Sequence, residues 1–187
     1  MKPPPNIAGA LFKFGCSSYY MDAKEAILSQ YLAALEMLKH AIVQCPDGLW
    51  DDPHNQNRFW RIAYHALFYT HLYLQTSESE FTAWSGHREK YHRLEFLPQP
   101  TAEQPELGKA YSKEEELAYL QICREQAKEK VAVLDLEAAS GFSWLPFSKL
   151  ELQLYNLRHL QQHIGELAER LWSRSAVEVD WVGGTSD

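Results

Sequence analysis

Residues 57–75 read NRFWRIAYHALFYTHLYLQ. This segment is apolar nearly all round, which is typical of a helix buried among other helices. We expect the helix to begin near residues 55–57 and to end before the polar run 76–80. One of its faces carries Ile62, His65, Phe68, Tyr69 and Leu72. Because such a helix needs apolar partners on every side, the rest of the chain must supply them.

Three further segments have helical periodicity and their own start and stop signals. Each opens with a cap residue that is followed three positions later by a glutamate, the pattern of a capping box. The expected starts are Asp22 with Glu25, Ser112 with Glu115, and Ser148 with Glu151. The expected ends are residues 46–48, 140–141 and 173–175.

A long stretch, residues 79–111, separates the second predicted helix from the third, and it can cross a bundle from one end to the other. We therefore predict an all-α fold, a four-helix bundle with a long crossover between helices 2 and 3. The chain forms a single domain, 1–187, with a core of about 22–172 and an N-terminal extension 1–21. The C-terminal tail 176–187 is expected to hold a short extended piece and then fray. The alternative, two domains split within the crossover, is disfavoured because neither half could bury its apolar faces alone.

The composition excludes some classes of partner. A formal net charge of −7 argues against nucleic acid and anionic membranes, since both need a basic surface. The cysteines, Cys16, Cys45 and Cys123, are odd in number and form no CxxC pair, as expected in a reducing cytosol. No apolar run reaches membrane-spanning length. We expect a cytoplasmic protein with neither a membrane segment nor a catalytic thiol.

The histidines carry the candidate chemistry. His159 and His163 are four residues apart, so they lie about 40° apart on one helix face and can bind one ion. Zinc proteases use this spacing with a glutamate after the first histidine, but Leu160 takes that position here. Both histidines lie on an apolar stripe, where polar groups need a partner. His65 lies mid-span on the most buried helix and could complete the site; the alternative is a core histidine bonded to a neighbour such as a tyrosine.

Three histidine ligands would leave coordination positions open for water or substrate, the pattern of a catalytic metal site. Three imidazoles suit Zn, Ni, Cu and Fe alike. Tyr155 and Asn156 precede His159 by one turn, and Glu166 follows His163 by nearly one turn, so each could orient an imidazole. For Glu166, a solvated position at the edge of the stripe is slightly favoured.

The other histidines are weaker candidates. His71 is about 120° around the helix from His65 and should not reach the same ion. His87 and His92 lie in the crossover and could join the site from above, although solvated loop positions are favoured. Surface positions are expected for His40, His54, Arg61 and Arg158. The two arginines could instead bind an acidic substrate.

RFWRIAYHALFYTHLYL, followed much later by LYNLRHLQQHIGEL, resembles the DinB-like (DinB/YfiT) superfamily. The resemblance covers about residues 22–172. It rests on one histidine in the second predicted helix and on an HxxxH motif in the fourth. An arginine precedes the first histidine of that motif, and a small residue follows the second. The matching positions are His65, Arg158, His159, His163 and Gly165.

The resemblance implies an up-down-down-up bundle that binds nickel, zinc or a similar ion through three histidines. It implies a homodimer formed through the bundle helices. Characterised relatives include transferases that use low-molecular-weight thiols such as mycothiol or bacillithiol. The long crossover and the N-terminal extension depart from the family pattern, so the substrate stays open.

The function expected from these observations is a metal-dependent enzyme, a thiol-dependent transferase with Zn or Ni as cofactor and a small molecule or thiol as partner. The metal would lower the pKa of a bound thiol or water. No catalytic side chain is identified. One alternative is a non-catalytic metal or small-ligand binding protein of stress response. Another is a bundle that binds a partner protein and satisfies its histidines internally.

Overall fold

The computed structural model describes residues 22–94 and 108–185, and residues 1–21, 95–107 and 186–187 lie outside the described part. Within the described part the chain is all-helical, so the predicted all-α class is confirmed. The predicted N-terminal extension and part of the predicted crossover fall outside it. None of the described helices combines the length and the apolar character needed to cross a membrane.

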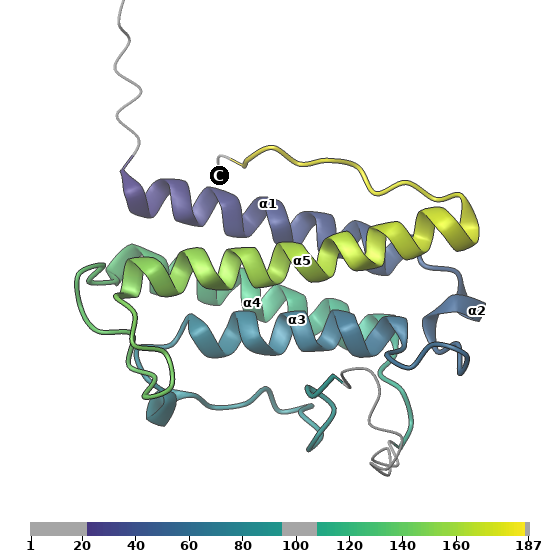
Figure 1. Ribbon diagram of the computed structural model, residues 1–187, viewed down its shortest axis with the longest axis horizontal. Coiled ribbons are helices and arrows are strands. Elements are labelled where there is room, and N and C mark those ends of the chain that lie inside the picture. The colour runs from purple at the N-terminus through teal and green to yellow at the C-terminus, as the bar shows by residue number, and fades with distance from the viewer. Residues whose placement is uncertain (1–21, 95–107, 186–187) are drawn as a thin grey trace, which may run out of the picture.

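Four long helices lie side by side, with short elements between them (Figure 1). Their bounds are α1 (Ala23–Gln44), α2 (Asp47–Trp50), α3 (Phe59–Tyr73), the 3-10 turn η1 (Glu78–Glu80), α4 (Lys113–Val133) and α5 (Lys149–Ser175). α1 and α3 each pack against both α4 and α5. In Figure 1, α1 and α5 run in one direction across the picture, and α3 and α4 run in the other. The chain must therefore return along the outside of α3 before α4 begins.

The sequence of α3 explains its place in the core. Every residue of this helix except Tyr69 is buried, as its continuous apolar character predicts. The large side chains Trp60 and Tyr64 are almost fully buried and contact aromatic residues of the crossover. α3 is thus the element around which both the bundle and the crossover are packed.

The predicted helix starts are observed, with one difference. At α4, the Ser112 Oγ accepts from the Glu115 amide (3.2 Å), and the Glu115 carboxylate accepts from the Ser112 amide (2.7 Å). The start of α1 has the same reciprocal pattern. At α5, the Ser148 Oγ accepts from the Glu151 amide (3.2 Å), which is one half of the box.

The predicted end of the third helix is wrong. α4 ends at Val133, ahead of the predicted residues 140–141. The backbone after α4 becomes extended and pairs with the start of α5. There the Leu150 amide donates to the Leu136 carbonyl (3.0 Å). This pairing competes with the helical hydrogen bonds that a longer α4 would need.

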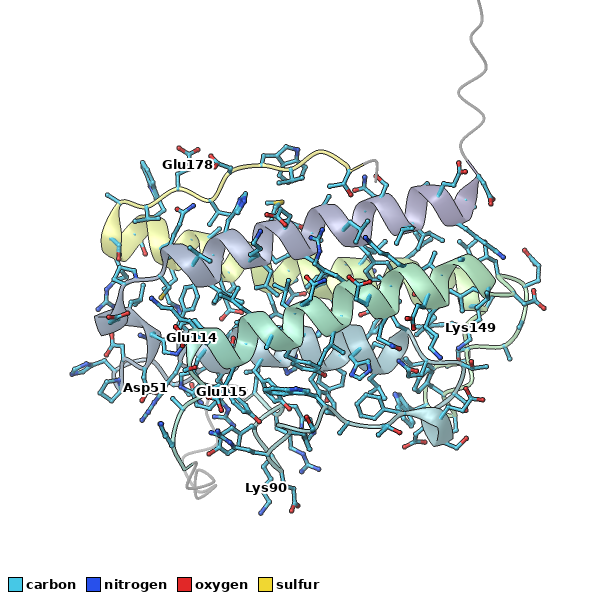
Figure 2. The ribbon with its side chains drawn as sticks, turned by 180° about the vertical axis from the view of Figure 1, so that it is seen from behind. Asp51, Lys90, Glu114, Glu115, Lys149 and Glu178 are labelled. Atoms are coloured by element: carbon cyan, nitrogen blue, oxygen red, sulfur yellow. The ribbon has the colours of Figure 1, made fainter. Side chains whose placement is uncertain are left out.

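A buried lysine joins this loop to the end of α3. Lys149 is 3% exposed, and its Nζ donates to the carbonyls of Gln75 (2.9 Å), Thr76 (2.7 Å) and Ser140. All three protons of the ammonium group therefore have acceptors. Gly141 has φ +82° and lies so close to the Thr76 carbonyl that no Cβ would fit. Lys149 lies at the opposite end of the bundle from Asp51 (Figure 2).

The C-terminal tail, residues 176–185, folds back along α1 (Figure 1). The Gln30 amide donates to the Gly183 carbonyl (3.2 Å), and the Thr185 backbone amide donates to the Ser29 Oγ (3.2 Å). Three valines of the tail also pack against the core. The prediction that the tail frays is therefore wrong for its described part, because these contacts tie it down.

Candidate metal centre

Three histidines from two helices converge mid-span between α3 and α5. The Nε2 of His159 lies 3.0 Å from the Nε2 of His65 and 3.2 Å from the Nε2 of His163. The potential ligand atoms of all three lie within 4.8 Å of one another. His65 and His163 are 8% and 7% exposed. The predicted trio therefore comes together, and it could bind a metal ion.

Hydrogen bonds fix the protonation pattern of two of the three rings. The Nδ1 of His65 lies 2.6 Å from the backbone carbonyl of His92, which can only accept, so His65 carries its proton on Nδ1. The Nδ1 of His163 lies 3.2 Å from a carboxylate oxygen of Glu166. The hydrogen bond from His163 is the main cause that lowers the pKa of Glu166, so this carboxylate is ionised and accepts. When each ring carries a single proton, His65 and His163 therefore both present an unprotonated Nε2 to His159.

The site consequently contains more acceptors than donors. His159 can carry one proton on Nε2 and satisfy one neighbouring lone pair, but not both. Its own Nδ1 is buried and has no hydrogen-bond partner. A buried cluster of unmatched acceptors is costly unless a cation balances it. A metal ion at the convergence of the three Nε2 atoms would do so.

The surroundings hold two of these imidazoles, those of His65 and His159, in the neutral form that binds metals. Burial lowers the pKa of His65 to about 3, with a further contribution from His163. Burial also lowers the pKa of His159 to about 4, again with a contribution from His163. At neutral pH both rings are therefore uncharged, and proton competition for the site is weak.

The spacing fits a transition metal. Imidazole nitrogens bind zinc at about 2.0–2.1 Å, which puts two nitrogens of a tetrahedral site about 3.4 Å apart. The observed separations of 3.0 and 3.2 Å need only a small outward adjustment. Three protein ligands leave a position for a small molecule.

Of the three residues predicted to orient the ligands, Glu166 contacts a histidine of the trio. It accepts from His163 and lies 3.5 Å from Arg170. Tyr155 instead packs its ring against Tyr73 and Phe147. This ring has no described contact with the trio.

Asn156 is also placed elsewhere. It is fully buried, and its Nδ2 donates to the Thr70 carbonyl (3.3 Å). The one-turn spacing from His159 correctly placed Tyr155 and Asn156 on the helix that carries this ligand. However, their side chains point to other parts of the α3–α5 contact.

The favoured solvated positions for the crossover histidines are wrong. His92 supplies the carbonyl that holds His65, and its ring stacks on Phe68 at 4.1 Å. The Nδ1 of His87 lies 2.6 Å from the Tyr64 hydroxyl. The ring of neither residue belongs to the trio, but the backbone of His92 touches it directly.

Tyr69 is a neighbour of the trio that we expected only as a core residue. Its ring centroid lies 4.7 Å from that of His65 and 5.5 Å from that of His159. It is the only residue of α3 that is not buried. Its position four residues after His65 could have identified it, since such pairs share a helix face.

The remaining candidates lie outside the site. The Nδ1 of His71 lies 3.2 Å from the Tyr119 hydroxyl, as expected for a histidine that cannot reach the trio. Arg61 is buried, so its predicted surface position is wrong, whereas Arg158 is exposed. The surface pairs found for the other histidines are His40 with Glu36 and His54 with Asp52.

Neither described cysteine is suited to catalysis. Cys45 and Cys123 are buried and form no disulfide, and Cys16 lies outside the described residues. Burial raises the pKa of Cys45 to about 12 and raises the pKa of Cys123 further. Both thiols therefore stay protonated at neutral pH and are poor nucleophiles.

Compared with protein-family models, curated proteins and solved structures, the chain matches none of them. The function is therefore inferred from the site itself, that is, from its donor atoms, their protonation and their spacing.

Proposed function

We propose that this chain is a DinB-like metal-dependent enzyme with the up-down-down-up bundle of that superfamily. His65, His159 and His163 would bind one divalent ion, Zn or Ni. The observation that carries the proposal is the excess of acceptors: two Nε2 lone pairs are fixed by outside hydrogen bonds and face a third imidazole. A divalent ion bound to imidazoles would lower the pKa of a coordinated thiol or water.

The protein residues have separate tasks in this proposal. The His92 carbonyl and the Glu166 carboxylate hold two ligands in the metal-binding tautomer. The Tyr69 ring covers one side of the trio and limits access of water there. Because both described cysteines stay protonated, the nucleophile would be a coordinated small molecule. A low-molecular-weight thiol fits that requirement, so we propose a thiol-dependent transferase, working in the cytoplasm as a homodimer.

One observation favours a second candidate, a non-catalytic metal-binding protein. Among the described residues, Glu166 is the carboxylate that touches the trio, and it is already engaged by His163 and Arg170. No spare carboxylate is therefore described beside the ligands. Such a protein would bind the ion equally well without turning over a substrate.

The metal is tested first. Elemental analysis of the purified protein should show about one transition-metal ion per chain. His163→Ala should abolish binding, and His40→Ala, which removes an α1 histidine outside the trio, should not. Full metal occupancy in His163→Ala would remove that residue from the ligand set. A wild-type chain that binds no metal, and whose melting is unchanged by a chelator, would overturn the proposal.

A cobalt-substituted sample then separates the two candidates. Titration with small thiols should shift the cobalt absorption bands if a thiol coordinates the ion. No shift with any thiol, in a sample that retains its cobalt, would favour the non-catalytic binding protein.

A further inference from the structure

The part of the crossover that follows η1 and ends at residue 94 is docked on α3 and on the start of α4. We call residues 84–94 the crossover clamp. The Tyr111 hydroxyl donates to the Gly86 carbonyl (2.8 Å), and an Arg88 nitrogen donates to the Glu115 carboxylate (2.9 Å). The Arg88 guanidinium also lies over the Tyr111 ring, 4.3 Å from its centroid. These contacts hold the clamp from the α4 side.

α3 holds the clamp through aromatic side chains. The Tyr64 hydroxyl lies 2.6 Å from the Nδ1 of His87, and the His92 ring stacks on Phe68. Tyr64 is fully buried, so the residue that holds His87 is itself fixed in the core. His87 and His92 are themselves neighbours, with ring centroids 5.5 Å apart. The clamp is therefore fixed to the same helix that carries His65.

This docking ends at the metal centre. Near the end of the clamp, His92 places its carbonyl 2.6 Å from the Nδ1 of His65. If the clamp lifted, the His65 Nδ1 proton would lose its acceptor. The ring could then turn or move its proton to Nε2, and a protonated Nε2 cannot bind a metal.

We propose that the crossover clamp is the positioning element of this site: its docking holds His65 ready for the metal, and metal binding in turn stabilises the docked clamp. The coupling is mutual because a bound ion makes the opposite N–H of an imidazole a stronger donor. Linkage requires that each event favours the other by the same factor. This inference rests on the proposed metal site and adds an element outside its ligands.

The chain offers a matched pair of variants. Tyr64→Phe removes the hydroxyl that bonds the clamp histidine His87 (2.6 Å). Tyr119→Phe removes the hydroxyl that bonds His71 of α3 (3.2 Å), within the same aromatic cluster. Both changes delete one tyrosine–histidine hydrogen bond and keep the ring, including the stack of Tyr119 on Trp84. Only the first change removes a hydrogen bond to the clamp.

The zinc dissociation constant of each variant is measured by competition with a chromophoric chelator, alongside unfolding in urea without metal. We expect Tyr64→Phe to weaken zinc binding about fivefold or more, in the range of ordinary coupling between sites. Tyr119→Phe should leave zinc binding close to wild type, whatever it costs in stability. Equal zinc affinities in the two variants would overturn the inference.

Hydrogen exchange gives the reciprocal readout. The amides of His87, Tyr91 and Arg93 donate to the carbonyls of residues 84, 88 and 90 within the clamp. Saturating zinc should slow their exchange in the wild type and leave it unchanged in His163→Ala. Zinc binding with no change at these amides would overturn the clamp alone. A wild type that binds neither zinc nor nickel would overturn the proposed function as well.

Discussion

Lys149 and the histidine trio are two buried sites, each with three acceptor atoms drawn from separate segments, and they are balanced in opposite ways. At Lys149, three backbone carbonyls converge on a cation that the chain itself supplies. At the trio, three imidazole nitrogens converge with no protein cation in described contact. The first site is complete within the chain, and the second has a place for an external ion.

The difference teaches how to separate a structural polar cluster from a binding site. Lys149, His65 and His163 are all buried, so burial does not separate the two clusters. Counting protons against lone pairs does, because a buried acceptor needs a donor or a cation. Lys149 has three protons for three carbonyls. The trio has at most one proton for its three inward-facing nitrogens.

The largest expected effect is at Lys149. Lys149→Met would leave three carbonyls, two of them in the buried residues Gln75 and Ser140, without their donor. It should lower the free energy of unfolding by about 3 kcal/mol. Urea denaturation measures this loss. Lys39→Met, at an exposed lysine of α1, should stay within about 0.5 kcal/mol of wild type. A loss at Lys149 no greater than at Lys39 would break the comparison.

The next effect is that of the metal on stability. Zinc at about 100 times its dissociation constant should raise the free energy of unfolding by about 2.7 kcal/mol. This gain in stability should vanish in His159→Ala. It should persist in Lys149→Met, which loses the lysine ammonium group and not the metal site. Parallel urea titrations with zinc and with chelator measure both. Loss of the zinc effect in Lys149→Met would show that the two sites are not independent.

A third buried group sharpens the comparison. Both carboxylate oxygens of Glu116 are buried and have no hydrogen-bond partner among the described residues, and burial raises the pKa of this carboxyl well above 4.5. The folded chain therefore keeps a proton that the unfolded chain releases. Stability is full below the unfolded pKa and declines as pH rises toward the folded value. Glu116 avoids a buried negative charge by keeping its proton, which is a third way for the chain to accommodate buried acceptor atoms.

Glu116→Met should accordingly stabilise the protein by about 1–2 kcal/mol at pH 8 and flatten the decline of stability with rising pH. Thermal melts between pH 5 and pH 8 provide the measurement. The control is Glu125→Met, at an exposed position on the same helix. Substitution by methionine is thus expected to destabilise the protein at Lys149 and to stabilise it at Glu116. A destabilised Glu116→Met would mean that the carboxyl has a favourable partner.

The smallest expected effect is at Glu166. Glu166→Gln should weaken metal binding about tenfold, because a neutral amide orients the His163 imidazole less firmly than a carboxylate. Stability without metal should change little, since the side chain is partly exposed. Glu169→Gln, at an exposed position of the same helix, should leave affinity unchanged. Metal competition assays that rank the two variants equally would remove Glu166 from the site.

Much of this arrangement could be predicted from the sequence. The continuous apolar character of residues 57–75 predicted the buried helix, and the HxxxH spacing placed two ligands on one face. The capping patterns located the helix starts closely. These signals succeed because each depends on a local property, either helical period or a cap three residues away.

The misses depend on tertiary contacts. The acceptor for His65 is a backbone carbonyl, which every residue has, so no residue type marks His92 for that task. The early end of α4 follows from pairing between the loop and α5, and the packed tail follows from bonds to α1. Tyr155 and Asn156 had the correct spacing, but packing against α3 determined where their side chains lie.

The parallel course of α3 and α4 has one more consequence, which concerns chain length. A connection between neighbouring parallel helices must retrace their length, roughly 30 Å for a helix of about 20 residues. An extended chain covers that distance with about ten residues, whereas residues 74–112 provide several times as many. A tight hairpin between antiparallel helices has no such surplus of residues in its connection. The topology therefore obliges the chain to lay a strip of backbone along α3, and that strip is the source of the carbonyl that His65 uses.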